Sequence, residues 1–146
     1  MNNILTFAMI KPNVVMDKQV GEIITQIEQN GFDILEMQLL RLTLEQAQAF
    51  YAVHKSLPFY QELCTYMSSG SVIVMCLEKE NAVAEFRKLI GATNPAEAAP
   101  GTIRQRFGKS LSENAIHGSD SPANAIKELD FFFSCCDSSC GCCCQG

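Results

Sequence analysis

Apolar and polar residues follow one another along this chain in two patterns, one typical of buried strands and one typical of amphipathic helices. Apolar runs at residues 4–10 and 72–77 have the length of strands, and the second predicts a central strand buried on both faces. A longer mixed run at 32–42 predicts another strand. A short fourth strand is expected just before the last helix.

Helices are expected where apolar residues recur every three or four positions. The first contains Val20, Ile23 and Ile27, and Asn30 followed by Gly31 ends it. The other helices are expected at residues 44–53, 60–67, 81–90 and 123–132.

Two helix ends carry specific capping signals. Thr43 followed by Gln46 predicts a capping box at the start of the helix at 44–53. Gly91 is the expected cap after the helix at 81–90. From 92 to 114 the chain is irregular and contains several Pro and Gly residues. Because long loops in compact domains usually carry function, this segment is a candidate part of a functional site.

The order of these elements predicts an α+β fold. Split β-α-β units of this kind form an antiparallel sheet with helices on one face, the ferredoxin-like arrangement. We therefore expect a ferredoxin-like α/β sandwich around a four-stranded antiparallel sheet. No internal repeat is evident.

Composition limits the classes of protein to consider. A chain of 146 residues is long enough for one domain with a sizeable core. Its net charge of −5 argues against broad nucleic-acid binding, whereas a small anionic ligand needs only a local basic pocket. No apolar run is long enough to cross a bilayer, and the N-terminus does not resemble a secretory signal. We expect a cytoplasmic protein.

The eight cysteines are distributed too unevenly for a disulfide framework. Cys64 and Cys76 lie in apolar segments, where a thiol behaves as a small buried hydrophobe. The other six fall between 135 and 144, so we divide the chain into a domain at 1–133 and a Cys/Ser/Gly-rich tail at 134–146. The tail is expected to be disordered, with metal binding or lipid attachment as alternatives.

His117 is the first candidate for chemistry, in the segment NAIHGSDSP at 114–122. A neutral imidazole is a good nucleophile, and the glycine beside it leaves room for a close ligand. Ser121 and Pro122 are also typical of a helix start. The alternative interpretation without a function is therefore a helix cap beside a surface histidine. His54, the other histidine, is expected at the surface.

Three sequence blocks, in the same order and spacing, make the chain resemble nucleoside diphosphate kinases. They are TFAMIKP at 6–12, GATNP at 91–95 with PGTIR at 100–104, and the segment around His117. The resemblance runs from about residue 4 to 133 and implies the ferredoxin-like fold. It also implies a two-step reaction, in which His117 takes the γ-phosphate of a nucleoside triphosphate such as ATP and passes it to a nucleoside diphosphate.

The resemblance assigns roles to further residues. Lys11, Arg87 and Arg104 would contact phosphates or ribose, and without the resemblance each would be a solvated surface charge. The aromatic ring of Phe59 would stack on the base, and Glu128 would orient the imidazole. The remaining implied site residues are Tyr51 near His117, Thr93 on a phosphate, Asn114 on the ribose, and Ser119, which acts with Glu128.

The resemblance also implies a cofactor and partners. Mg²⁺ would bridge the nucleotide phosphates, held mostly by substrate oxygens and water, with no dedicated metal site in the protein. The partners would be nucleoside di- and triphosphates, without stable nucleic-acid or membrane binding. The family forms tetramers or hexamers from a common dimer, and the short end after the last helix favours a tetramer.

Some features depart from the family pattern. Asn13 and Val14 replace the usual acidic-Gly or acidic-Ala pair, Ser71 replaces a usual proline, and the tail is atypical. The segment GKS at 108–110 resembles the end of a phosphate-binding P-loop, but it lacks the required upstream glycine. Two other functions remain open: a nucleotide-binding regulatory module without turnover, and a metal- or membrane-interacting protein that acts through its tail.

Overall fold

The structure, a computed structural model, describes residues 4–133, so the expected tail at 134–146 lies outside the described part. Four strands form one antiparallel sheet in the order β2-β3-β1-β4. They are β1 (Leu5–Ile10), β2 (Asp33–Arg41), β3 (Ser71–Glu78) and β4 (Ile116–Gly118). The α+β fold with a four-stranded antiparallel sheet is therefore confirmed.

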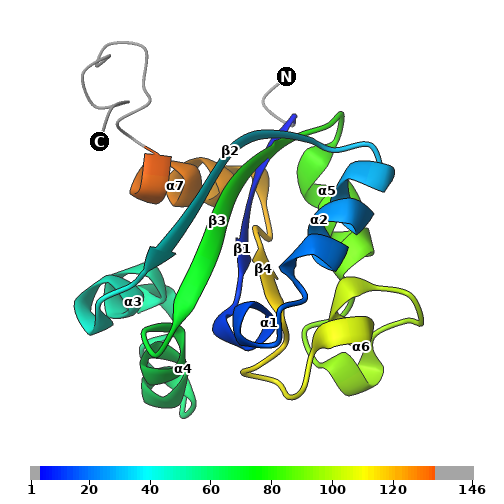
Figure 1. Cartoon of the computed structure of the whole chain (residues 1–146). Coiled ribbons are helices and arrows are strands. Elements are labelled where there is room, and N and C mark those ends of the chain that lie inside the picture. The colour runs from blue at the N-terminus through cyan, green and yellow to red at the C-terminus, as the bar shows by residue number, and fades with distance from the viewer. Residues whose placement is uncertain (1–3, 134–146) are drawn as a thin grey trace.

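Helices cover both faces of the sheet, so the expectation that they cover only one face is wrong (Figure 1). One face packs against α2 (Val20–Gln29), α5 (Ala82–Ile90) and α6 (Ile103–Phe107). The other packs against α3 (Leu44–Phe50), α4 (Tyr60–Met67) and α7 (Pro122–Phe133).

The reason lies in the two central strands. Successive side chains of a strand point to opposite faces of a sheet. In β1, Ala8 and Ile10 belong to one hydrophobic cluster, and Phe7 and Met9 belong to the other. All four are fully buried, so both faces of the sheet need a helical layer.

Most elements end within one residue of the expected positions, and larger differences occur at three places. The helix expected at 44–53 ends at Phe50, and a 3₁₀ helix, η1 (Ala52–His54), follows it. The region expected to be irregular contains η2 (Pro95–Glu97) and α6. A short helix that the periodicity did not predict, α1 (Pro12–Met16), begins with proline at its first position, which proline's fixed φ favours.

The expected capping signals are present in the structure. Thr43 Oγ1 accepts a hydrogen bond from the Gln46 N–H at 3.0 Å, and the Gln46 side chain accepts one from the Thr43 N–H at 2.9 Å. Gly91 ends α5 with a φ of 90°, a conformation that favours glycine. Ser121 Oγ accepts from the Asn124 N–H at 3.1 Å and so caps α7.

Gly118 allows β4 to lie close to α5. A Cβ atom at this position would come within 2.9 Å of side-chain atoms of both Phe86 and Ile90, which are buried. Hydrogen therefore suits the position better than any side chain, because Phe86 and Ile90 have little room to move in the core. This close packing fixes the strand that carries His117.

Removing the capping hydroxyl in front of α3 should destabilise the protein modestly. Thr43→Ala leaves the Gln46 N–H without its partner and should lower the free energy of unfolding by about 1 kcal/mol in urea titrations. Thr43→Ser keeps the hydroxyl and serves as the control, with stability close to that of the unaltered protein. Equal losses in the two variants would contradict the assigned role of the cap.

Candidate active site

A pocket of about 370 Å³ gathers most of the predicted site residues. Eight of the ten line it: Lys11, Tyr51, Phe59, Arg87, Thr93, Arg104, Asn114 and His117. The other two, Ser119 and Glu128, hydrogen-bond to one another behind the imidazole of His117. Residues that are more than 100 positions apart in sequence thus come together in one pocket.

The pocket forms where several chain segments end around the β1–β4 pair. Lys11 follows β1 directly and His117 lies in β4, which pairs with β1 so that His117 is opposite Met9. Tyr51 follows α3, and Arg87 projects from α5. The long segment between α5 and β4, which the sequence marked as a candidate, supplies Thr93, Arg104 and Asn114.

The imidazole of His117 is held by one carboxylate and three aromatic rings. Its Nε2 lies 3.0 Å from Glu128 Oε1, and Ser119 Oγ donates to the same oxygen at 2.6 Å. The rings of Phe7, Phe50 and Tyr51 pack around the imidazole, with centroid distances of 5.9, 5.2 and 6.2 Å. In a neutral imidazole, a hydrogen bond from Nε2 to the ionised carboxylate, which only accepts, leaves the lone pair on Nδ1 free.

Lys11 is buried beside other cations, which changes its protonation. Its side chain is only 5 % exposed, and Nζ donates to the Ser112 carbonyl oxygen at 3.3 Å. Burial, together with the nearby Arg104 guanidinium, lowers the pKa of Lys11 to about 7. An anionic ligand in the pocket would oppose both effects and favour the charged form.

Arg104 is fixed by backbone carbonyl groups. Its Nε and Nη2 donate to the Ile116 oxygen at 3.2 and 2.9 Å, and Nη1 donates to the Gly91 oxygen at 3.0 Å. Burial and the neighbouring Arg87 lower the pKa of Arg104 to about 10, so it remains charged at neutral pH. A guanidinium group has five N–H donors, so two remain for a ligand.

Two polar atoms at the pocket are buried without a hydrogen-bond partner among the described residues: the Tyr51 hydroxyl and Asn114 Oδ1. Asn114 Nδ2 donates to the Thr93 carbonyl oxygen at 2.9 Å, which fixes the direction of the amide. Burial, and secondarily Glu128, raises the pKa of Tyr51, so its hydroxyl stays a donor. An unpaired buried polar group costs roughly 1–3 kcal/mol, which a ligand that bonds to it would recover.

The pocket also contains residues that the sequence did not single out. His54 was expected at the surface, but it is half-buried and lines the pocket, with its ring 6.3 Å from Tyr51 and 6.4 Å from Phe59. His54 is the last residue of η1, which begins two positions after the end of α3. The sequence contained a signal for this position, because His54 follows the predicted site residue Tyr51 by three positions, and positions three apart share a helix face. The other additional lining residues are Leu63, Leu111, Ser112, Gly118 and Asp120.

The pocket is locally basic although the chain is acidic overall. Lys11, Arg87 and Arg104 line it together with one carboxylate, that of Asp120. Within residues 4–133, no group of three His, Cys, Asp or Glu side chains is arranged to hold a metal ion. None of the described helices is both long enough and apolar enough to span a membrane.

Comparisons with known proteins agree on one family. The family model described as nucleoside diphosphate kinase matches residues 5–137. The chain is 56% identical to a nucleoside diphosphate kinase of Pelobacter propionicus and 55% identical to one of Chlamydia abortus. Each match spans 129 residues and covers 88% of this chain, with 94% of the Pelobacter protein and 92% of the Chlamydia protein.

Solved structures show the same likeness. The nucleoside diphosphate kinase of Aquifex aeolicus superposes with a TM-score of 0.87 at 41% identity, covering 89% of this chain and 94% of that one. A halophilic nucleoside diphosphate kinase from Halobacterium salinarum, solved in complex with CDP, has a TM-score of 0.86 at 37% identity. That match covers 90% of this chain and 88% of the other.

Replacing Lys11 should change how stability depends on pH. The pKa of Lys11 is about 7 in the folded protein, against an ordinary value of 10.5, so the unfolded chain binds more protons between these values. The free energy of unfolding should therefore rise from pH 7 to 9 in the unaltered protein relative to Lys11→Met. The difference should grow by at most about 1.4 kcal/mol per pH unit in urea titrations. Parallel pH profiles would show that Lys11 keeps its ordinary pKa.

Proposed function

The chain belongs to the nucleoside diphosphate kinase family, and we propose that His117 carries the phosphoryl group in its reaction. The reaction moves the terminal phosphate of a nucleoside triphosphate to a nucleoside diphosphate. The observation that carries the proposal is the position of His117, whose ring is held by Glu128 inside a pocket lined by three cationic side chains.

In the first step, Nδ1 of His117 attacks the γ-phosphorus. A bond forms between this nitrogen and phosphorus, and the bond from phosphorus to the β–γ bridging oxygen breaks. The diphosphate leaves with that electron pair. In the second step, a terminal oxygen of another nucleoside diphosphate attacks the phosphohistidine and regenerates the free imidazole. The hydrogen bond from Nε2 to Glu128 supports Nδ1 as the nucleophile, because it keeps the lone pair on Nδ1.

The cationic residues of the pocket supply electrostatic stabilisation. Negative charge spreads over the equatorial oxygens of a phosphoryl group during transfer, and positioned donors stabilise it. We assign Arg87, Arg104 and Thr93 to the phosphates of the nucleotide. Lys11 and the unpaired Tyr51 hydroxyl would act next to the transferred group, where phosphate would favour the charged form of Lys11.

The remaining pocket residues fit a nucleoside. Phe59 is half-buried and lines the pocket, so its ring is available to stack on a base. Stacking tolerates any base, which suits broad nucleotide specificity. Asn114 has a buried oxygen without a partner among residues 4–133, and a ribose hydroxyl would satisfy it.

We assign Mg²⁺ to the substrate phosphates rather than to a protein cage. Asp120 supplies the one carboxylate among the described residues that line the pocket, and its Oδ1 also accepts from Asn124 Nδ2. One carboxylate with phosphate oxygens and water is a usual ligand set for Mg²⁺. When bound, the ion would neutralise phosphate charge and polarise the phosphoryl group.

Two alternative functions differ from phosphoryl transfer through His117. A regulatory module would bind nucleotides without forming phosphohistidine. A metal- or membrane-interacting protein would act through the tail at 134–146, which lies outside the described residues. A cytoplasmic location stays an expectation from the sequence.

Intact-protein mass after brief incubation with ATP and Mg²⁺ tests the proposal, with the sample kept alkaline to preserve phosphohistidine. We expect a gain of one phosphate that GDP removes, and no gain in His117→Ala. Glu128→Ala keeps the nucleophile but loses its orienting bond, so it should still gain the phosphate, roughly tenfold or more slowly. A folded protein that gains no phosphate would favour the regulatory module. Phosphate gain in His117→Ala would exclude His117 as the carrier.

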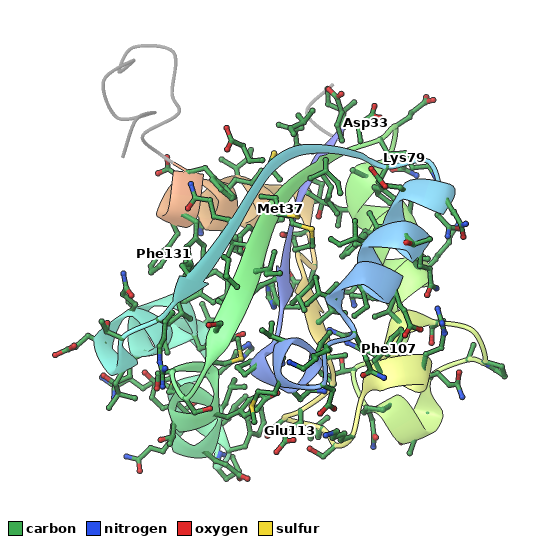
Figure 2. The ribbon with its side chains drawn as sticks, in the orientation of Figure 1. Asp33, Met37, Lys79, Phe107, Glu113 and Phe131 are labelled. Carbon is green, nitrogen blue, oxygen red and sulfur yellow. The ribbon has the colours of Figure 1, made fainter. Side chains whose placement is uncertain are left out.

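We also propose that the protein is a homo-oligomer. β2 lies at the edge of the sheet, and Leu35, Met37 and Leu39 on it are 50, 50 and 66 % exposed. Met37, which is labelled in Figure 2, lies opposite Met75 of β3. An exposed edge strand with apolar side chains is a template for pairing with another copy. This observation supports a dimer along β2 as the unit from which the expected tetramer, rather than a hexamer, would form.

Light scattering on purified protein tests the assembly. The unaltered protein should have the mass of an oligomer, and Met37→Lys should lower that mass because the interface would bury an unpaired charge. Ile126→Lys, the same change at an exposed apolar residue on α7, is the control and should leave the mass unchanged. A monomeric unaltered protein would contradict the assembly, and an unchanged mass for Met37→Lys would exclude β2 as the interface.

A further inference from the structure

Asn13 is a buried polar residue outside the pocket, and its side chain and backbone N–H form hydrogen bonds with two other chain segments. It is 4 % exposed. Its backbone N–H donates to the Tyr66 hydroxyl oxygen at 2.8 Å, and its Oδ1 accepts from the same hydroxyl at 2.7 Å. Its Nδ2 donates to the Phe107 carbonyl oxygen at 3.2 Å. We call these three residues the Asn13 network.

Each member of the Asn13 network lies about one helical turn or less from a residue of the pocket. Asn13 follows Lys11 by two positions in the first turn of α1. Tyr66 follows Leu63, which lines the pocket, by one turn of α4. Positions three apart in a helix lie on the same face.

The third member connects the network to Arg104. Phe107 ends α6, one turn after Arg104, and Figure 2 shows it between α6 and α1. The chain continues from α6 into the segment that carries Ser112 and Asn114. The network therefore joins α4, which follows Phe59 and carries the pocket residue Leu63, to the two segments with the buried cations.

We propose that the Asn13 network positions the two sides of the pocket relative to one another, so that Lys11 and Arg104 meet the phosphates while α4 contacts the base. This inference rests on the function proposed above. Asn13 and Tyr66 act as positioning residues, since neither lines the pocket. One of these hydrogen bonds is buried and two are partly buried, which suits the task, because breaking such a bond leaves unsatisfied groups and so opposes small shifts.

The chemistry of the network requires an amide at position 13. An asparagine side chain accepts and donates at once, so it can bond to both Tyr66 and the Phe107 carbonyl. A carboxylate at this position, as in the pattern from which the chain departs, would accept from Tyr66 but could not donate to the carbonyl. Burial raises the pKa of Tyr66, which keeps its hydroxyl able to donate.

A surface ion pair spans two of the same segments but is a weaker connection. Lys109 Nζ lies 2.9 Å from Asp17 Oδ2, which joins the end of α1 to the loop after α6. Both side chains are exposed, at 54 and 40 %, and exposed pairs contribute little. The buried network is therefore the stronger constraint between α1 and α6.

Single-turnover phosphorylation of His117 by ATP and Mg²⁺ tests the proposal in the full chain. Tyr66→Phe removes one hydroxyl. It should slow phosphoryl transfer about tenfold, while ATP affinity changes less than about threefold. The reason is that a small displacement of the pocket groups weakens their stabilisation of the transition state more than their binding of ATP. Tyr60→Phe is the matched control. It removes a hydroxyl from the same helix, one that donates to the Gln48 carbonyl, and should react at the unaltered rate.

Asn13→Asp breaks the network at its other edge. It keeps the acceptor for Tyr66 and loses the donor to Phe107, so transfer should again slow, although Tyr66 is intact. Circular dichroism establishes that each variant is folded at the assay temperature. If folded Tyr66→Phe and Asn13→Asp both react at the unaltered rate, the network has only a structural role and the inference fails. If the unaltered protein itself gains no phosphate on His117, it is the proposed function that fails.

Discussion

The burial of two cations at one end of the sheet is the constraint on which the rest of this structure depends. Lys11 and Arg104 are each less than 10 % exposed. Charged groups are costly to remove from water, and two like charges close together add to the cost. The protein offsets this cost with backbone carbonyl groups from Ser112, Gly91 and Ile116. Those bonds in turn determine the path of the long segment between α5 and β4.

The same constraint explains why the pocket favours an anion. Its cationic donors are only partly satisfied by the protein, and the Tyr51 hydroxyl and Asn114 Oδ1 have no partner within the described chain. A nucleotide would satisfy these groups and compensate the positive charge. These unsatisfied groups lower the stability of the free protein at the pocket. The same groups are already oriented toward a ligand, which is the preorganisation that electrostatic catalysis requires.

The sheet supplies the rigidity that this arrangement needs. β1 and β3 are buried on both faces, so any shift of β1 would disturb two hydrophobic clusters at once. β4 is only three residues long, yet pairing with β1 and the close contact of Gly118 with α5 hold it in place. His117 is therefore carried by one of the shortest elements of the domain without depending on that element's own stability.

Local sequence signals predicted most of the elements and the residues of the candidate site. Hydrophobic periodicity is a pattern along the chain itself. The Thr43 capping box and the Gly91 cap depend on residues close together in sequence, so they too can be recognised from the sequence. The resemblance carried by three short blocks named ten site residues, and eight of them line one pocket.

Only the tertiary structure decided what depends on distant contacts. The two-sided helical packing and the bonds of Asn13 join segments far apart in sequence, and the nitrogen of His117 that faces Glu128 depends on how α7 packs on the sheet. Such contacts follow from burial and packing in three dimensions, to which no local pattern corresponds.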